Sequence, residues 1–296
     1  MMAAKRVEKN KKEKIEQKEI EGGKSGEKVS AFREYTQMII EVLVLVFFIN
    51  AFLLQSQTIP TGSMEDTMLV GDHLLVDKSA YAPYLGTWDK NFLPRLDIKR
   101  GMIITFKAPP EMDKDYVKRV IACPGETIRI KDKKVFINGK PLDEPYAVFK
   151  GEMPTDGDNY PLDQPRMIDP LGTMTYLPIY IMNEYGGIDT PRTVEFCERF
   201  KNNVIMDESG NRVFNVPDGY YFCMGDNRDN SYDCRFWGPV PERNILGKPW
   251  RIYWSYESST GEYLTPGIAH KIKDLALTVV HFFTKTRWDR MFKKFS

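Results

Sequence analysis

Residues 116–122 read Tyr-Val-Lys-Arg-Val-Ile-Ala, a short apolar run that ends before the turn signal Pro124-Gly125. Runs of this length, rich in β-branched and aromatic residues and bounded by Gly or Pro, are typical of strands. Four further runs of the same kind lie at 73–77, 102–106, 134–137 and 250–254. Many short strands joined by Gly/Pro turns predict a mainly β fold, built as an antiparallel sheet or a partly open barrel.

The segment that precedes these strands has a different character. Met38 to Leu54 is apolar except for Glu41 and Asn50, and seventeen helical residues rise about 26 Å, enough for a thin bilayer. A cleaved signal peptide sits at the very N-terminus and ends at small residues, whereas this run follows a long charged tail. We therefore predict an uncleaved transmembrane anchor at 36–55, in preference to a cleaved signal or a buried core helix.

Residues 1–35 form a Lys/Glu-rich tail with almost no apolar side chains, so the tail is predicted to be disordered or loosely helical. Ten Lys/Arg residues lie between Lys5 and Arg33. The positive-inside rule then predicts a single-pass protein of the cell membrane, with a cytoplasmic N-terminus and everything after the anchor on the outer face.

The rest of the chain divides by composition. Residues 56–256 carry the strand pattern, and within them 147–212 are rich in Pro, Asp and Gly, which indicates an inserted subdomain. Residues 257–296 are basic and amphipathic, and are too short in apolar sequence to span a membrane. A helix on the membrane surface and a helix packed on the domain both fit this segment. Its apolar face comprises Ile268, Ile272, Leu275, Val279, Phe282 and Phe283.

Composition argues against several functions. The net charge of +1 argues against nucleic-acid binding, which requires a basic surface. The four cysteines form no Cys-x-x-Cys pair and there are only three histidines, which argues against a zinc site. We expect no metal and no cofactor. Cys223 and Cys234 are a candidate disulfide if the domain lies outside the cytosol, and four free buried thiols fit the sequence equally well.

One candidate nucleophile follows the anchor, in Ile-Pro-Thr-Gly-Ser-Met at 59–64. The Pro and Gly favour an irregular turn that presents Ser63, although a serine in such a turn is commonly just a turn residue. A serine nucleophile needs a base within hydrogen-bond reach. His73 lies ten residues away in a predicted strand, so a triad based on it stays open, whereas His270 and His281 lie in the C-terminal segment.

Lys118 is the alternative base. Strand alternation places it on the same face as Tyr116, Val120 and Ala122, and burial would lower its pKa and favour the neutral amine that a base requires. An edge-strand lysine that discourages aggregation gives the same pattern. From the pattern alone, the edge-strand interpretation is the better supported.

A dense polar loop at 225–238 reads Gly-Asp-Asn-Arg-Asp-Asn-Ser-Tyr-Asp-Cys-Arg-Phe-Trp-Gly. Its acidic spacing does not match the EF-hand calcium pattern, and two arginines sit among the acids. We interpret it as a loop of structural ion pairs that borders a site.

Taken together, these segments resemble the type I signal peptidases, a family of Ser/Lys proteases. The resemblance covers most of 56–256 and rests on the motifs at 60–64, 71–78, 116–125 and 225–238. It implies a mostly β fold of coiled sheets with a variable insertion. It also implies a membrane-bound serine endopeptidase that cleaves N-terminal signal peptides from exported preproteins. The anchor ends so close to Ser63 that we expect the site to face the membrane surface, and we expect the enzyme to act as a monomer.

The resemblance assigns roles to individual residues. It implies Ser63 as nucleophile and Lys118 as general base, with the Ser63 N–H and the Thr61 hydroxyl forming the oxyanion hole. Ser231 would orient Lys118. Two ion pairs would stiffen the surroundings, formed by Asp233 with Arg235 and by Asp226 with Arg119.

The chain departs from the family pattern at four positions. Thr61 stands where Ser is frequent, Asp66 where Pro is common, Cys234 where Ser is usual and Phe236 where Tyr is usual. None of these removes a catalytic group, and Asp66 is expected to alter the local path of the chain and the substrate preference.

Two other functions remain as alternatives. A self-cleaving regulatory protease shares the dyad, but such proteins usually carry a DNA-binding domain and no membrane anchor. A membrane-anchored binding protein without activity would be expected to have lost Ser63 or Lys118.

Overall fold

The computed structural model describes residues 31–79, 97–109, 112–151, 158–169, 172–182, 187–259 and 277–295. The chain divides into two compact units, Met1–Ile49 and Asn50–Ser296. Most of the predicted charged tail and much of the predicted C-terminal amphipathic face lie outside the described residues.

The first unit contains the helix α2 (Ala31–Phe48), which continues as one π-helical turn, η1 (Ile49–Leu53). Phe32–Leu53 is long and apolar enough to cross a membrane, and none of its apolar stretch is buried. The helix begins at Ala31, before the predicted anchor boundary of 36, and its added first turn includes the exposed Phe32 and Tyr35. Strand structure starts at Leu54, directly after the helix.

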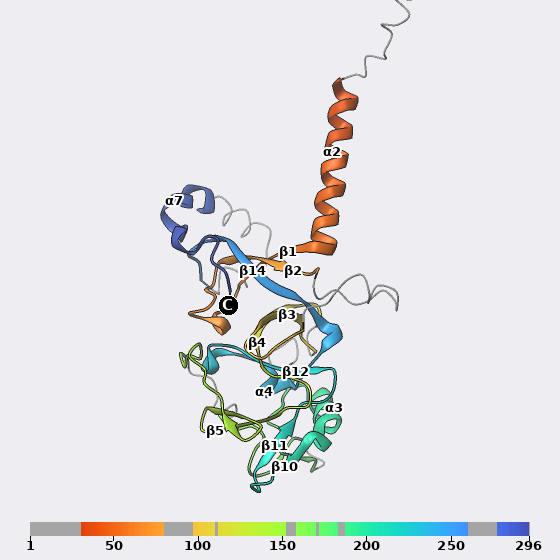
Figure 1. Ribbon diagram of the computed structural model, residues 1–296, viewed down its shortest axis with the longest axis vertical. Coiled ribbons are helices and arrows are strands. Elements are labelled where there is room, and N and C mark those ends of the chain that lie inside the picture. Colours follow the sequence, from red (N-terminus) through yellow and green to blue (C-terminus); the bar gives the residue numbers. More distant parts are fainter. Residues whose placement is uncertain are drawn as a thin grey trace, which may run out of the picture. The chain divides into compact units, whose positions relative to one another are not determined.

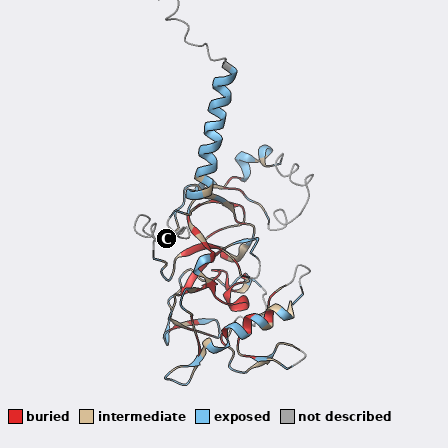
Figure 2. Ribbon diagram, turned by 90° about the vertical axis from the view of Figure 1, so that its right-hand side faces the viewer, coloured by how far each residue is buried: buried red, intermediate tan, exposed pale blue. Residues whose placement is uncertain are grey.

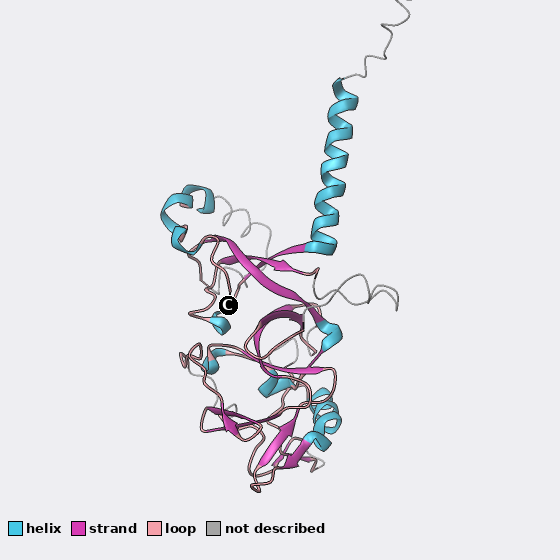
Figure 3. Cartoon of the chain, viewed as in Figure 1, coloured by secondary structure: helices cyan, strands magenta, loops and turns pink. Residues whose placement is uncertain are grey.

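The second unit is built around a seven-stranded antiparallel sheet that is strongly curled at its strands β3 and β4 (Figures 1 and 3). Its order is β1-β2-β14-β3-β4-β12-β13. The strands are β1 (Leu54–Thr58), β2 (Asp72–Asp77), β14 (Ile245–Ser255), β3 (Ile103–Lys107), β4 (Asp115–Ala122), β12 (Tyr220–Met224) and β13 (Val240–Pro241). This curled sheet confirms the prediction of a mainly β, antiparallel fold.

Strand β14 is longer than the predicted run at 250–254. It starts at Ile245 because Gly247 allows close approach to β2: a Cβ there would lie 2.3 Å from the Asp77 carbonyl oxygen. Its register shifts between Pro249 and Arg251, where the proline lacks an N–H for the ladder. Because of this irregularity, apolar and polar residues do not alternate regularly along the whole of β14, and the sequence predicted only its second half.

A second, five-stranded sheet has the order β10-β11-β5-β6-β7. Asn138 and Gly139 both have positive φ, as the predicted hairpin turn after β6 requires. The strands of this five-stranded sheet are β5 (Thr127–Lys131), β6 (Lys134–Ile137), β7 (Lys140–Pro141), β10 (Val204–Met206) and β11 (Arg212–Asn215).

The described residues of the predicted insertion, 147–212, contribute side chains to a core shared with the seven-stranded sheet. Tyr160 and Phe200 from this segment pack in one cluster with Phe106 and Val120 of the seven-stranded sheet. The segment contains β8 (Arg166–Met167), β9 (Met174–Thr175), α3 (Thr190–Phe200), η5 (Lys201–Asn203) and β10. It is thus part of the same folded body as the strands on either side of it.

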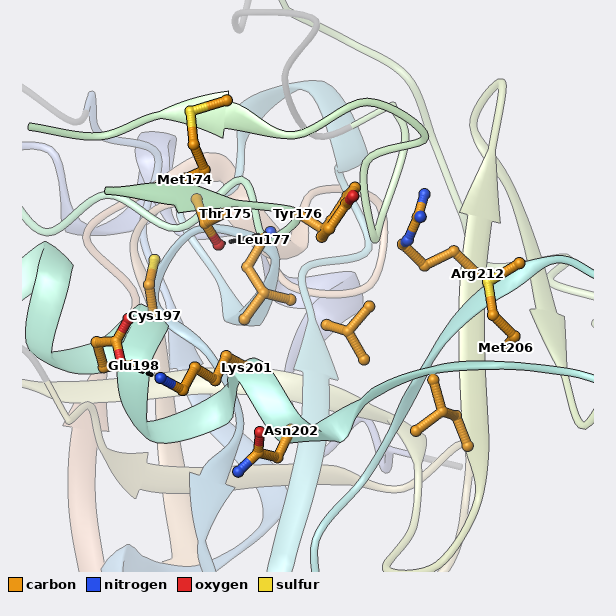
Figure 4. A pocket seen from close by; sticks show the side chains of 12 residues that line it. Met174, Thr175, Tyr176, Leu177, Cys197, Glu198, Lys201, Asn202, Met206 and Arg212 are labelled. Carbon is orange, nitrogen blue, oxygen red and sulfur yellow. Dashed lines mark hydrogen bonds and ion pairs between the residues drawn. The ribbon is translucent and has the colours of Figure 1, made fainter. Parts of the chain in front are cut away.

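A pocket of about 430 Å³ opens between β9, α3, β10 and β11 (Figure 4). Leu177 and Cys197 are buried in it, and Met174 and Met206 are exposed at its rim. None of its lining residues belongs to the predicted site.

The seven-stranded sheet separates two cores. Alternate residues of β3 face opposite sides, since Ile104 belongs to the larger cluster and Ile103 to a smaller one that also holds Met64, Met68 and Val117. In Figure 2 buried residues line the strands of the second unit and one side of α3. The smaller core lies under the turn that carries Ser63.

Short helical elements complete the described chain. They are η2 (Gly62–Met64), η6 (Arg228–Asn230), α4 (Cys234–Trp237), η7 (Glu242–Asn244), α7 (Phe282–Lys285) and η8 (Trp288–Arg290). α7 packs partly on the domain, because the Phe282 ring stacks on Trp254 with centroids 6.2 Å apart. Phe283, in contrast, is 79% exposed.

Candidate active site

Ser63 lies in the short helix η2, in a turn that leaves the end of β1 and returns to the start of β2. Ile59 and Asp72 close the base of this turn, with the Ile59 N–H donating to the Asp72 carbonyl at 2.9 Å. Met64, next to Ser63, is 1% exposed and belongs to the smaller core. The buried neighbour fixes the backbone, so that the half-buried serine is held in place.

Lys118 lies on β4, opposite Ile104 of β3. Its Nζ donates to Ser63 Oγ at 2.5 Å, across 55 residues of sequence. The lysine is 3% exposed, and its Nζ lies 5.6 Å from the centroid of the Tyr116 ring on the same strand. The structure therefore brings the two residues of the predicted dyad into direct contact.

Burial lowers the pKa of Lys118 from 10.5 to about 8. The carboxylates of Asp233 and Asp226 oppose this effect, because a nearby negative charge favours the ammonium form. Two carboxylates therefore act on the lysine in addition to its burial. The remaining shift still brings the amine into the range where a general base works near neutral pH.

The loop 225–238 approaches Ser63 from the other side. The Asn227 N–H donates to the Ser63 carbonyl at 3.1 Å. Gly225 lies so close that a Cβ on it would be 2.5 Å from that carbonyl oxygen and 2.3 Å from Ser231 Oγ. Only glycine fits at this position, which explains why the polar loop begins with one.

Ser231 is buried against Gly225, with 1% exposure. Within the described residues, no hydrogen bond joins its hydroxyl to Lys118. The structure thus places Ser231 beside the nucleophile's backbone without the direct contact to the base that was expected of it.

The two predicted ion pairs are both present and buried. Arg119 Nε and Nη2 donate to the two carboxylate oxygens of Asp226 at 2.8 and 2.7 Å. Arg235 Nε and Nη2 donate to Asp233 at 2.9 and 3.0 Å. Burial, the largest single effect, would raise the pKa of Asp233, but the charge and hydrogen bonds of Arg235 together with hydrogen bonds from Gly225 and Ser231 hold that pKa below its usual value.

Thr61 precedes η2 and is exposed. Its side chain makes no capping hydrogen bond to the helix, so the hydroxyl is not consumed there. Asp66 has φ 72°, a backbone conformation closed to proline, whose φ is fixed near −65°. The predicted change in the local chain path at this position therefore has a concrete form.

His73, the alternative base, faces other partners. Its Nδ1 is 3.0 Å from Thr58 Oγ1, and its ring stacks on Trp254 with centroids 4.6 Å apart. No hydrogen bond between His73 and Ser63 occurs in the described part of the chain. The geometry favours Lys118 as the partner of Ser63.

Sequence reasoning missed two buried ion pairs. Arg228 Nη1 donates to Glu144 Oε2 at 3.0 Å, and Arg290 Nη2 donates to Asp72 Oδ2 at 2.6 Å. Asp72 and Arg228 lie in recognised motifs. Glu144 and Arg290 carry no local signal, because each pairs across 84 or more residues of sequence.

All four cysteines are free thiols. Cys223 and Cys234 are free, and the Cys223 N–H donates to Cys234 Sγ at 3.1 Å. Among the described residues there is no cluster of three or more His, Cys, Asp or Glu that could hold a metal ion.

Comparisons with known proteins show that the chain is similar to signal peptidases. The model of the family "signal peptidase, peptidase S26" matches residues 32–254. The chain is similar to signal peptidase I of Pseudomonas aeruginosa, with 34% identity over 234 residues that cover 75% of this chain and 72% of that protein. It is also similar to signal peptidase I of Aquifex aeolicus, with 34% identity over 229 residues that cover 72% of this chain and 81% of that protein.

Proposed function

Because the chain belongs to the signal peptidase family, peptidase S26, we propose that it is a membrane-bound serine endopeptidase that removes N-terminal signal peptides from exported preproteins. The observation that carries the proposal is the 2.5 Å contact between Lys118 Nζ and Ser63 Oγ. A buried lysine with a lowered pKa beside a serine hydroxyl is the arrangement that activates a serine without histidine.

Lys118 transfers one proton in each half of the reaction. Neutral Lys118 takes the proton from Ser63 Oγ as the oxygen attacks the scissile carbonyl carbon of the substrate. The resulting ammonium then gives that proton to the amine that leaves, which yields an acyl-enzyme on Ser63. Lys118 next takes a proton from water as the water oxygen attacks the ester carbon, and the resulting ammonium returns that proton to Ser63 Oγ as the acyl group leaves as a carboxylic acid.

The negative oxygen of the tetrahedral intermediate needs hydrogen-bond donors. The Ser63 N–H and the Thr61 hydroxyl take this role, supported by the position of Thr61 at the start of η2 and by the absence of a capping bond to its side chain. One such donor is typically worth about 10²–10³ in rate.

The polar loop and β4 keep the dyad rigid. The Arg119–Asp226 pair sits next to Lys118 in sequence, and the Arg235–Asp233 pair holds the loop that contains Ser231. Ser231 is proposed to orient the lysine once substrate is bound, which is supported by its burial beside Gly225.

The membrane part of the proposal rests on α2. The helix is proposed to cross the cell membrane once, with the Lys/Arg-rich N-terminus in the cytoplasm and the β domain on the outer face. The lipid bilayer and the preprotein are the proposed partners, and the enzyme is proposed to act as a monomer.

Cleavage of a preprotein by the purified full chain in detergent tests the proposal. The wild type should release a signal peptide at one bond, located by mass spectrometry, and Ser63→Ala and Lys118→Ala should release none while keeping the wild-type melting curve. Arg251→Ala serves as a control, since among the described residues that side chain contacts the Phe292 carbonyl and the Trp250 ring rather than the dyad. Cleavage at the same bond by Ser63→Ala would refute the proposal.

A further inference from the structure

The turn that carries Ser63 is fastened by a segment from the far end of the chain. We call residues 62–71 the nucleophile turn and residues 286–291 the C-terminal clamp. The clamp follows α7 and lies beside β14: Trp254 Nε1 donates to Thr286 Oγ1 at 3.2 Å, and the Phe292 N–H donates to the Ile252 carbonyl at 2.7 Å. The clamp is thus fixed to the same sheet that holds the turn.

Asp72, where the nucleophile turn enters β2, is the centre of the contact. Its carboxylate is fully buried, and Arg290 Nε and Nη2 donate to its two oxygens at 3.1 and 2.6 Å. Ser255 Oγ donates to the same group at 2.6 Å, and the Leu69 N–H at 2.9 Å. A buried carboxylate with this many donors holds both the turn and the clamp to β14.

Arg290 also reaches the turn itself. Its Nη2 donates to the Thr67 carbonyl at 3.3 Å, and Thr67 Oγ1 donates to Asp226 Oδ2 at 2.6 Å. Asp226 in turn binds Arg119, the neighbour of Lys118 on β4. A continuous series of polar contacts therefore links Arg290 to the strand that carries the base.

Arg287 makes a second attachment. Its Nη2 donates to the Val70 carbonyl in the turn and, at 2.7 Å, to the Tyr256 carbonyl beyond β14. Gly71 lets these parts meet, because a Cβ there would lie 1.9 Å from the Tyr256 carbonyl oxygen. The two arginines, three residues apart, thus satisfy carbonyls at two points of one turn.

We propose that Arg287 and Arg290 are positioning residues for Ser63, and that the active site is complete only when the C-terminal clamp is docked on the nucleophile turn. The inference rests on the proposed function. Neither arginine touches the reacting atoms. They act by fixing the backbone on which Ser63 must meet Lys118, and a shift of about 1 Å in such a geometry costs on the order of 10² in rate.

The test compares four variants of the full chain in detergent: Arg290→Ala, Arg290→Lys, Arg287→Ala and, as matched control, Lys294→Ala. Lys294 is an exposed basic residue of the same C-terminal stretch and has no contact with the turn among the described residues. Cleavage of a preprotein gives kcat and KM, and amide hydrogen exchange reports on residues 62–71.

Arg290→Ala should lower kcat by about 10–100-fold with KM unchanged, and should speed exchange in the nucleophile turn but not in β5 or β11. Arg290→Lys should recover part of kcat, because the charge beside Asp72 returns without the two-pronged geometry. Lys294→Ala should match the wild type. Arg287→Ala leaves no buried charge unpaired, so it should fold and still lower kcat, which keeps the test valid if Arg290→Ala unfolds.

Wild-type kcat per folded molecule in Arg287→Ala and in the Arg290 variants would overturn the inference, whether or not exchange in the turn had changed. If the wild type itself cleaved no preprotein, the proposed function would fail. Hydrogen exchange would then judge the clamp by itself, and unchanged exchange at 62–71 in Arg290→Ala and Arg287→Ala would refute it.

Discussion

The seven-stranded sheet and the layer between it and the five-stranded sheet bury different kinds of side chain. Around the seven-stranded sheet, seven charged side chains are 5% exposed or less: Asp72, Lys118, Arg119, Asp226, Arg228, Asp233 and Arg235. Between that sheet and the five-stranded one, the equivalent depth is filled by aromatic rings. Tyr160, Phe214 and Phe222 are fully buried, with ring centroids 4.9–6.1 Å apart.

The difference separates two tasks. Buried charges are costly to desolvate and contribute little net stability, but once paired they fix directions precisely. Buried rings contribute stability through area and packing, with little demand on orientation. We infer that the charged region positions the dyad while the aromatic region supplies much of the folding free energy.

Removing a charge next to the dyad should have the largest combined effect. Asp226→Asn leaves Arg119 without its anion and is expected to cost about 3–5 kcal/mol of unfolding free energy. Because Asp226 also raises the pKa of Lys118, its loss should move the acid limb of activity to lower pH. Urea unfolding and a pH–rate profile measure the two effects.

Asp229→Asn is the matched control for that change. Asp229 lies in the same loop but pairs with Lys133, whose side chain is 40% exposed, so the change should cost less than about 1 kcal/mol. Equal losses from the two variants would show that the buried pair has no special role.

Removing a ring from the aromatic region should affect stability alone. Phe214→Ala is expected to lower the unfolding free energy by about 3–5 kcal/mol, because the ring is fully buried and its neighbours cannot fill the space. Under conditions where the variant is folded, kcat should equal that of the wild type. Ile205→Ala, at a 41% exposed side chain on β10, should be nearly neutral in both measurements. A kcat reduced tenfold in folded Phe214→Ala would mean that the two regions are not separable.

An exposed ion pair at the site should matter least. Lys150 Nζ lies 2.6 Å from Asp66 Oδ1, but both side chains are 51% exposed, so Lys150→Ala should change stability by less than about 1 kcal/mol, with an equally small change in kcat. Asp66→Pro should be far more harmful, since proline cannot adopt the φ of 72° found there. A tolerated proline would mean that this turn has another path in solution.

The same comparison explains what the sequence could predict. Strands such as β4 and β6 were predicted nearly to the residue, because alternation and flanking turns are local signals. The dyad came from the family resemblance, since pattern alone left Ser63 a turn residue and Lys118 an edge lysine. The Asp72–Arg290 pair lies beyond such reasoning, because 218 residues separate its partners and Arg290, unlike Asp72, lies in no recognised motif.

The packing of 147–212 was also out of reach. Its Pro, Asp and Gly content predicts an inserted subdomain, but that composition does not indicate that Tyr160, Leu177 and Phe200 enter the core shared with the seven-stranded sheet. Composition averages over a segment, whereas core membership is decided by individual side chains.

Lys118 also links pH to stability with a definite sign. Its pKa is about 8 in the folded protein against 10.5 for an ordinary lysine, so between these values the unfolded chain binds more protons at this site. The contribution of Lys118 to stability therefore rises with pH across that window.

The pH dependence of preprotein cleavage tests the central claim most directly. If Lys118 must be neutral to activate Ser63, kcat/KM should rise roughly tenfold per pH unit up to about pH 8 and then level off. Lys118→Ala should lose about 10²–10⁴ in rate and the limb with it. An acid limb well below pH 8 that persists in Lys118→Ala and disappears in His73→Ala would contradict the account and make His73 the base, because burial lowers the pKa of that imidazole.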